Sequence, residues 1–355
     1  MRVLVTGHLG YIGTVMVPLL IEHGCDVVGV DSDLYEQCTY GNGIQNIPFL
    51  KKDIRDLQSS DLGGFEAIIH LAGLSNDPLG DLNPELTYQI NHKASVHLAQ
   101  LAKSVGVNRF LFSSSCSNYG EAGEEMLTEE ANFHPVTPYG ISKVRVEQEV
   151  AKLADSDFSP TFLRSATAYG VSPRLRFDLV LNNLVAWAFT TGLVYLKSDG
   201  SPWRPIVHIE DISRAFLAVL KAPRELIHNQ AFNVGLTEEN YRIRELADIV
   251  KDTVPGCRIE YAKEAGPDKR CYRVNCSKLA KTFPEFKPQW NVRLGASQLY
   301  SSFKRIGLKL GDFEGPRFKR IDHIKKLLKS GRLDKTLRWS IESITSTSSE
   351  ADTVS

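Results

Sequence analysis

Short apolar runs alternate with helical patterns over the first half of the chain. The runs that predict strands lie at residues 3–5, 27–30, 49–50, 67–71, 109–113 and 161–163. Helical patterns begin at Tyr11, Pro84 and Tyr139 between these runs. Such alternation predicts a parallel sheet covered by helices on both faces, which is the doubly wound, Rossmann-type α/β architecture.

A second, smaller unit is predicted after the last of these strands. The alternation becomes irregular there, with a helix expected at 179–191, another at 211–221, and mixed pieces to about residue 311. We expect a dinucleotide-binding domain at 1–170 with return elements at 206–235, and a substrate domain at 171–205 and 236–315. This second domain is expected over the carboxyl ends of the strands, where open sheets bind ligands.

The end of the chain differs in composition from the rest. Residues 316–342 are basic and place Ile321, Ile324, Leu327 and Leu328 at helical spacing, which predicts a surface helix docked on the body. Residues 343–355 are rich in Ser and Thr and poor in bulky apolar side chains. This composition predicts a disordered tail.

Charge and cysteine usage exclude several classes of partner. The 355 residues contain 42 Lys and Arg and 42 Asp and Glu, so the formal net charge is zero. The protein as a whole therefore has no excess positive charge that would attract nucleic acid or an anionic membrane. No apolar run approaches the roughly 18 residues of a membrane span, and no leader precedes the first strand, which predicts a cytoplasmic protein. The six cysteines and nine histidines show no metal-ligand spacing, so no metal is expected.

The segment TGHLGYIG joins the first strand to the first helix and predicts a phosphate-binding turn. Gly7 permits a tight turn, Gly10 lets backbone approach a pyrophosphate, and Gly13 allows the helix to pack on the strand. Backbone amides at the helix start, around Tyr11 and Ile12, would then face the phosphates.

An acidic residue ends the second strand and favours NAD over NADP. The Asp31 carboxylate would accept hydrogen bonds from the adenosine ribose and repel a 2′-phosphate, and Asp33 adds to that repulsion. Further adenosine and diphosphate contacts are expected after the next two strands. These contacts are Asp53, Ile54, Leu71, Ala72 and Gly73.

A tyrosine and a lysine four residues apart supply candidate chemistry. Tyr139 and Lys143 would share one face of a helix, which places an ammonium beside a phenol. The ordinary pKa of a phenol is about 10, and neighbouring positive charge favours the phenolate that a general base requires. Ser115, at the end of the fifth strand, can donate a hydrogen bond to the same substrate oxygen.

Taken together, these motifs resemble the extended short-chain dehydrogenase/reductase family, specifically its sugar-nucleotide epimerases, dehydratases and ketoreductases. The resemblance covers about residues 1–283 and rests on TGHLGYIG, Asp31, HLAG, Asn91 in QINHKAS, SSSCSNYG, YGISK and LRSATAYG. It implies that Tyr139 is the catalytic base, Lys143 its partner and a ribose ligand, and Ser115 the orienting hydroxyl. It also implies that Asn91 supports the NAD site and that the protein is a homodimer.

The residues after Ser115 bear on which member of this family the chain resembles. The 4,6-dehydratases carry Asp-Glu there, whereas this chain has Cys116 and Ser117, which disfavours water elimination. Transient oxidation of a sugar hydroxyl, expected at C4, remains and leads to epimerisation. A sugar-nucleotide dehydrogenase or ketoreductase stays open, as does a dinucleotide-binding protein without turnover.

A nucleoside-diphosphate sugar is the expected substrate and requires cations for its phosphates. By resemblance, the positions that would contact it are Cys116, Ser117, Asn182, Arg204 and Arg270. His208 and Asp211 are expected to tie a loop to the core. The family usually reads RPxNVYG where this chain has RSATAYG, which changes the nicotinamide end of the cleft.

Overall fold

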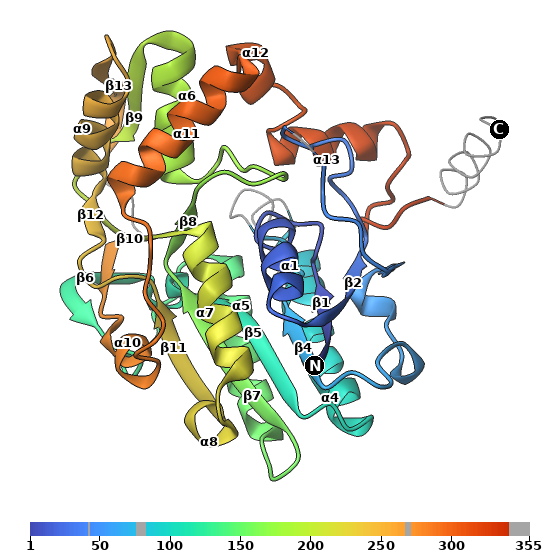
Figure 1. Cartoon of the computed structure of the whole chain (residues 1–355). Helices are drawn as coiled ribbons and strands as arrows, with labels where there is room; N and C mark the ends of the chain where they lie inside the picture. Colours follow the sequence, from blue (N-terminus) through green and yellow to red (C-terminus); the bar gives the residue numbers. More distant parts are fainter. Residues whose placement is uncertain (42, 76–82, 267–270, 341–355) are drawn as a thin grey trace.

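The computed structural model of the chain describes residues 1–41, 43–75, 83–266 and 271–340 (Figure 1). Two expectations fall outside these residues, the phosphate contact at Arg270 and the disordered tail at 343–355.

A seven-stranded parallel sheet forms the centre of the molecule, in the order β11-β7-β5-β4-β1-β2-β3. Its strands are β1 (Arg2–Thr6), β2 (Asp26–Asp31), β3 (Phe49–Lys51), β4 (Ala67–His70), β5 (Arg109–Ser115), β7 (Ser159–Ser165) and β11 (Gln230–Val234). The predicted doubly wound sheet is confirmed. β11 adds a seventh strand that the apolar runs of the first half of the chain do not contain.

Helices cover both faces of this sheet because its side chains alternate between them. Val3 and Val5 pack toward one face, against α1 (Gly13–Glu22) and α7 (Ile209–Lys221), whereas Leu4 packs toward the other. The second face is covered by α3 (Pro84–Thr87), the π-helix η3 (Tyr88–Lys93), α4 (Ala94–Ser104) and α5 (Pro138–Val150). In the described part of the chain, no helix combines the length and the apolar character needed to cross a membrane.

Part of the second half of the chain lies beyond the central sheet, in the upper part of Figure 1, whereas β11 and α7 belong to the sheet and its cover. The main helices of this upper part are α6 (Val180–Thr191), α9 (Ile243–Thr253) and α11 (Val292–Ile306), which share a core with Tyr169 and Phe177. Small sheets join this part to the loops of the central sheet. Their strands are β6 (Glu121–Leu127), β8 (Thr167–Tyr169), β9 (Leu193–Ser198), β10 (Trp203–His208), β12 (Asn240–Arg242), β13 (Arg258–Gly266) and β14 (Cys271–Val274).

Single helical turns complete the connections between these elements. They are η1 (Ile54–Asp56), η2 (Ser59–Asp61), η4 (Cys116–Tyr119), η5 (Ala151–Leu153), α8 (Arg224–Ile227), α10 (Ser277–Thr282) and α12 (Leu310–Phe313).

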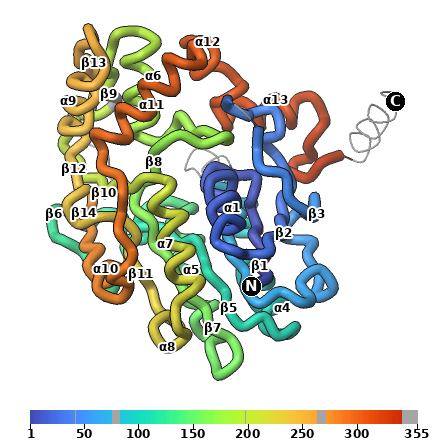
Figure 2. Tube along the Cα trace, viewed as in Figure 1, coloured from blue at the N-terminus to red at the C-terminus, as the bar shows by residue number. Residues whose placement is uncertain are grey.

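The C-terminal helix α13 (Arg320–Lys329) returns to the first half of the chain. Figure 2 shows this segment, in red, beside the blue loop that follows β2. Ile324 and Leu327 are buried in the core below it, and His323 donates a hydrogen bond of 3.0 Å to the Leu34 carbonyl. Trp339 donates another, of 2.6 Å, to the Ser32 carbonyl.

Candidate active site

The glycine turn between β1 and α1 is as tight as its sequence predicts. Gly7 has a φ of +75°, and a Cβ added there would lie 2.7 Å from the Ala72 nitrogen. A Cβ on Gly13 would lie 2.4 Å from the Gly7 carbonyl oxygen, so helix and strand can approach only with glycine at that position. The Gly7 amide donates 2.8 Å to the Val30 carbonyl, which links the turn to β2.

Replacing Gly7 with alanine is expected to weaken NAD binding at least about tenfold, the equivalent of about 1.4 kcal/mol. The added methyl would displace backbone around Ala72 as well as strain the turn. Gly24→Ala is the matched control, because Gly24 has a φ of +80° but nothing within 4 Å of its added Cβ. Calorimetric titration of both variants with NAD checks this, and equal affinities would contradict it.

The start of α1 and the end of β2 fit the adenosine diphosphate half of a dinucleotide. Among the described residues, none accepts a hydrogen bond from the Tyr11 or Ile12 backbone amide. Ile12 also lines a large cleft between the two halves of the molecule. The Asp31 carboxylate accepts 3.0 Å from the Leu9 amide and 2.8 Å from the Asp33 amide. Each carboxylate oxygen retains a lone pair for a ribose hydroxyl.

The other predicted cofactor residues fall into two groups. Leu71 and Gly73 line the cleft beside the glycine turn. Asp53 instead turns its carboxylate to the Arg55 guanidinium, at 2.6 Å, and the Ile54 side chain is buried in the core. The Asp53 carboxylate retains an acceptor position on Oδ2, whereas Ile54 can reach a cofactor only through its backbone.

Asn91 acts on the loop after β4. Its side chain accepts 2.7 Å from the Leu74 amide and donates 2.9 Å to the Leu74 carbonyl. Asn91 is buried, so it shapes the Gly73–Leu74 turn without facing the cleft. His70, the last residue of β4, lies between the Thr6 and Ser95 hydroxyls, and burial lowers its pKa to about 3, so it is a packed, neutral histidine.

A cleft of about 960 Å³ separates the two halves of the molecule. Its walls bring together eight residues predicted from the sequence, namely Ile12, Leu71, Gly73, Ser115, Ser117, Tyr139, Lys143 and Arg204. Such a volume is typical of pockets that bury a cofactor and a small substrate. Nowhere in the described ranges do three His, Cys, Asp or Glu side chains group as a metal site.

Tyr139 and Lys143 lie one turn apart at the start of α5. Thr137 caps this helix by accepting 3.2 Å from the Gly140 amide, which fixes Tyr139 in the first turn. The Lys143 ammonium lies 5.6 Å from the centre of the Tyr139 ring and donates 2.7 Å to the Ser113 carbonyl. Burial lowers the pKa of Lys143 to about 7, and the Glu147 carboxylate opposes this shift.

Ser115 ends β5 on the same wall of the cleft. Its Oγ accepts 3.1 Å from the Ser117 amide and 2.9 Å from the Ser117 hydroxyl. With both acceptor positions used, the Ser115 O–H is oriented to donate toward the cleft.

A buried polar network supports this wall from below. Glu147 on α5 forms a bidentate pair with the Arg164 guanidinium, whose Nη2 lies 2.7 Å from Oε2. The same carboxylate accepts hydrogen bonds from Ser114 and, at 3.0 Å, from Asn118. These contacts link α5, β5 and β7, so the strand end that carries Ser115 is held against the helix that carries Tyr139.

Two residues predicted to touch substrate point elsewhere. Cys116 is fully buried and its thiol donates 3.1 Å to the Arg164 carbonyl, because the helical turn after Ser115 directs it into the core. Asn182 is also fully buried, accepting 3.0 Å from the Gly170 amide and donating 3.1 Å to the Tyr11 hydroxyl. Both assignments to the substrate site are therefore wrong, and Asn183, the next residue on α6, lines the cleft instead.

Arg204 reaches the cleft from β10 and lies with its guanidinium 5.7 Å from the centre of the Tyr272 ring. The cleft also contains residues that sequence reasoning missed, among them Arg176 and Arg320. Arg176 stands in the segment RLRFD, where an arginine between apolar residues is a signal for a buried cation. Arg320 comes from the C-terminal segment, and no local pattern places it here.

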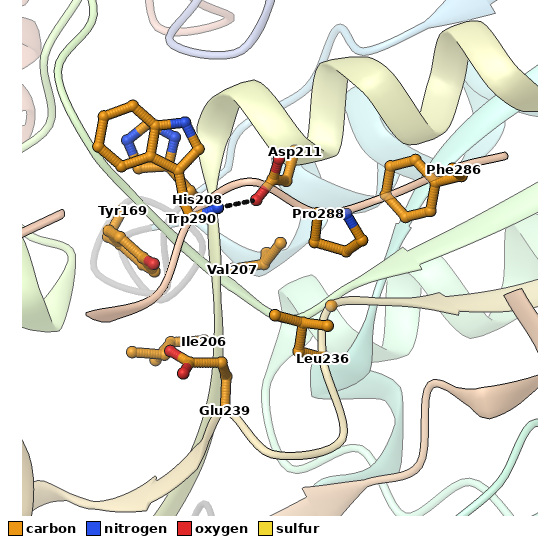
Figure 3. Close-up of a pocket in the computed structure, with 11 residues that line it drawn as sticks. Tyr169, Ile206, Val207, His208, Asp211, Leu236, Glu239, Phe286, Pro288 and Trp290 are labelled. Carbon is orange, nitrogen blue, oxygen red and sulfur yellow. Dashed lines mark hydrogen bonds between the residues drawn. The ribbon is translucent and has the colours of Figure 1, made fainter. Parts of the chain in front are cut away.

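His208 and Asp211 form a structural joint at a second cavity of about 10 Å³, which has room for about one water molecule. Figure 3 shows Trp290 stacked on His208, with ring centres 3.9 Å apart, and the Trp290 amide bonded to Asp211 at 3.0 Å. The Gln289 amide binds the same carboxylate. As predicted, these residues tie a loop to the core.

Comparisons with known proteins agree with this geometry. Residues 3–235 match the model of the NAD dependent epimerase/dehydratase family. A UDP-glucose 4-epimerase of Corynebacterium glutamicum is 27% identical over 271 residues, 71% of this chain and 80% of that protein.

Solved structures of similar proteins have the same fold. UDP-glucose 4-epimerase of Thermotoga maritima with UDP-glucose has a TM-score of 0.75 at 25% identity, over 87% of this chain and 100% of that one. MoeE5 in complex with UDP-glucose and NAD has a TM-score of 0.74 at 25% identity, with the same two coverages.

Proposed function

Because the chain belongs to the NAD-dependent epimerase/dehydratase family, we propose that it epimerises a nucleoside-diphosphate sugar by transient oxidation of one hydroxyl, at C4. Membership of this family confirms the predicted resemblance and the use of NAD by an enzyme of this type. The sugar, its carbon and the roles of individual residues are part of the proposal.

One observation carries the proposal: Ser115, Tyr139 and Lys143 lie on one wall of a cleft that also contains the glycine turn. Water elimination needs an acid and a base beyond these three residues. The positions after Ser115 supply neither, because Cys116 is buried and Ser117 is a hydroxyl. The remaining chemistry is removal and return of hydrogen at one carbinol.

Each residue then has a role that its contacts support. Ser115 donates to the sugar oxygen and holds it near Tyr139, which takes the hydroxyl proton as general base. The Lys143 ammonium stabilises the phenolate electrostatically. NAD, when bound, supplies a reversible hydride acceptor beside the sugar carbon. The Gly7–Gly13 turn, Asp31, Leu71 and Gly73 would hold it, while Ser117 and Arg204 would contact the substrate.

Product analysis tests the proposal. The protein is incubated with UDP-, dTDP-, GDP- and CDP-hexoses, with and without added NAD, while absorbance at 340 nm and NMR spectra are recorded. An inverted sugar stereocentre without accumulated NADH is expected. Stoichiometric NADH would instead identify a sugar-nucleotide dehydrogenase, and an unchanged panel would favour a ketoreductase or a non-catalytic protein.

The pH dependence of kcat/KM should be set by the Tyr139–Lys143 pair. Because the two groups interact, each apparent pKa describes loss of a proton from the pair and not from one residue. Tyr139 can accept a proton only after the pair has lost one, so kcat/KM is expected to rise with pH through an apparent pKa near 7. In Lys143→Met no ammonium stabilises the phenolate, and the rise should move toward about 10, the ordinary pKa of a phenol. Profiles of kcat/KM against pH check this, and an unchanged midpoint in the variant would contradict it.

A further inference from the structure

The C-terminal segment forms part of the cleft wall. Phe313, Glu314 and residues 318–321 line the same cavity as Tyr139 and the glycine turn. This segment is also fixed to the loop after β2, through the hydrogen bonds of His323 and Trp339. α13 therefore begins at the cleft and continues along the side where Asp31 ends its strand.

Arg320, the first residue of α13, brings a guanidinium into this wall. The residue is only 8% exposed. Its guanidinium carbon, Cζ, lies 4.3 Å from the centre of the Tyr35 ring. One nitrogen donates 3.3 Å to the Arg174 carbonyl. No carboxylate forms an ion pair with Arg320 within the part of the chain that the structure describes. The Asp31 and Asp178 carboxylates act on Arg320 electrostatically from beyond ion-pair distance, so a ligand phosphate can still supply its direct counter-charge.

Two further arginines stand beside it, and one of them, Arg174, has incomplete partners. Arg174 pairs with Asp33 at 2.9 Å, but its Nε and Nη1 are buried without a hydrogen-bond partner in the described structure. Arg176 pairs with Asp178 at 2.6 Å and donates to Ser75. Asp31 also lies within electrostatic reach of Arg174 and Arg320. The three guanidinium groups therefore stand near three carboxylates, those of Asp31, Asp33 and Asp178, but among the described residues only Arg174 and Arg176 form ion pairs with them.

We propose that Arg320 binds the diphosphate of a nucleotide in the cleft, so that the C-terminal segment is an integral part of the nucleotide site. A guanidinium offers the fork of donors that matches phosphate oxygens, and Arg320 lines the cleft without an ion-pair partner among the described residues. The inference rests on the proposed function only in placing a nucleotide in this cleft.

The surroundings of Arg320 favour the diphosphate of NAD over that of the sugar nucleotide. Its neighbour Arg174 pairs with Asp33, two residues after the predicted ribose ligand Asp31. The Ser172 hydroxyl donates 2.8 Å to the Tyr11 carbonyl, so the arginine segment is fixed directly to the phosphate-binding turn.

Direct binding to the full-length, nucleotide-free protein tests this proposal without turnover. Arg320→Gln is titrated calorimetrically with NAD, ADP-ribose and UDP. The affinity for NAD and ADP-ribose is expected to fall about tenfold, as for loss of one hydrogen bond to a charged group. Lys325→Gln is the matched control, because it removes the same charge from an exposed position on α13 and should bind as the wild type does.

The separate ligands identify the source of the diphosphate. A loss for UDP alone would keep the diphosphate site but overturn its assignment to NAD. Unchanged affinities for all three would overturn the proposal.

Thermal unfolding without ligand distinguishes a structural role. The midpoint of Arg320→Gln is expected to equal or exceed that of the wild type. A lower midpoint with unchanged affinities would mean that Arg320 only packs on Tyr35. Arg320→Lys should recover part of the binding, because it keeps the charge and loses the fork.

Discussion

Replacing Tyr139 with phenylalanine is expected to lower kcat by about 1,000-fold, the middle of the range for loss of a general acid or base. The change removes only the hydroxyl that would take the sugar proton, and the ring that lies 5.6 Å from Lys143 stays in place. NAD affinity should therefore change little. Steady-state rates and a calorimetric NAD titration of the same preparation measure both quantities.

The matched control for this variant is Tyr300→Phe. Tyr300 lies on α11 and packs edge-on against Phe189, with ring centres 6.0 Å apart, outside the residues that line the cleft. It loses the same atom and should keep wild-type turnover. Turnover of Tyr139→Phe within a few fold of the wild type would remove Tyr139 from the mechanism.

The largest effect on stability is expected at the buried pair below the active site. Glu147→Gln leaves the Arg164 guanidinium buried without its counter-charge, and loss of one partner of such a pair costs about 3–5 kcal/mol of unfolding free energy. Arg164→Met should cost a similar amount, because it leaves the Glu147 carboxylate buried without its counter-charge. The double variant should be less destabilised than the sum of the two single variants, because neither charge is then stranded.

Urea unfolding of the three variants measures this coupling. Glu85→Gln is a suitable control, because the Glu85–Lys93 pair is exposed on both sides and its removal should leave the unfolding free energy nearly unchanged. Additive effects of Glu147→Gln and Arg164→Met would show that the two side chains do not stabilise each other.

Local patterns predict most of the fold and the centre of the site. The apolar runs at β1, β4 and β5 are buried on both faces of a parallel sheet, so these strands can be predicted from the sequence alone. Gly7 and Gly13 can be predicted in the same way, because the local geometry of the turn leaves no room for a Cβ at either position. Tyr139 and Lys143 follow from the periodicity of one helix.

Features that depend on distant segments could not be predicted in this way. Cys116 follows Ser115 directly, yet a helical turn directs its thiol into the core while Ser115 and Ser117 face the cleft. Asn182 and Asn183 differ by one position on α6, about 100° of helix rotation, and only the second lines the cleft. Arg320 reaches the site from the other end of the chain, so its role becomes visible only when the tertiary contacts are known.

In the proposed reaction, hydrogen leaves and returns at one sugar carbon in the cleft around Tyr139. The most direct test uses a UDP-hexose deuterated at C4, or another nucleoside-diphosphate hexose that the protein accepts, with NMR of the products in ordinary water. The expected product has an inverted C4 that retains its deuterium, with no solvent hydrogen at C4 or C5. Inversion with solvent hydrogen at C4, or inversion at another carbon, would contradict it.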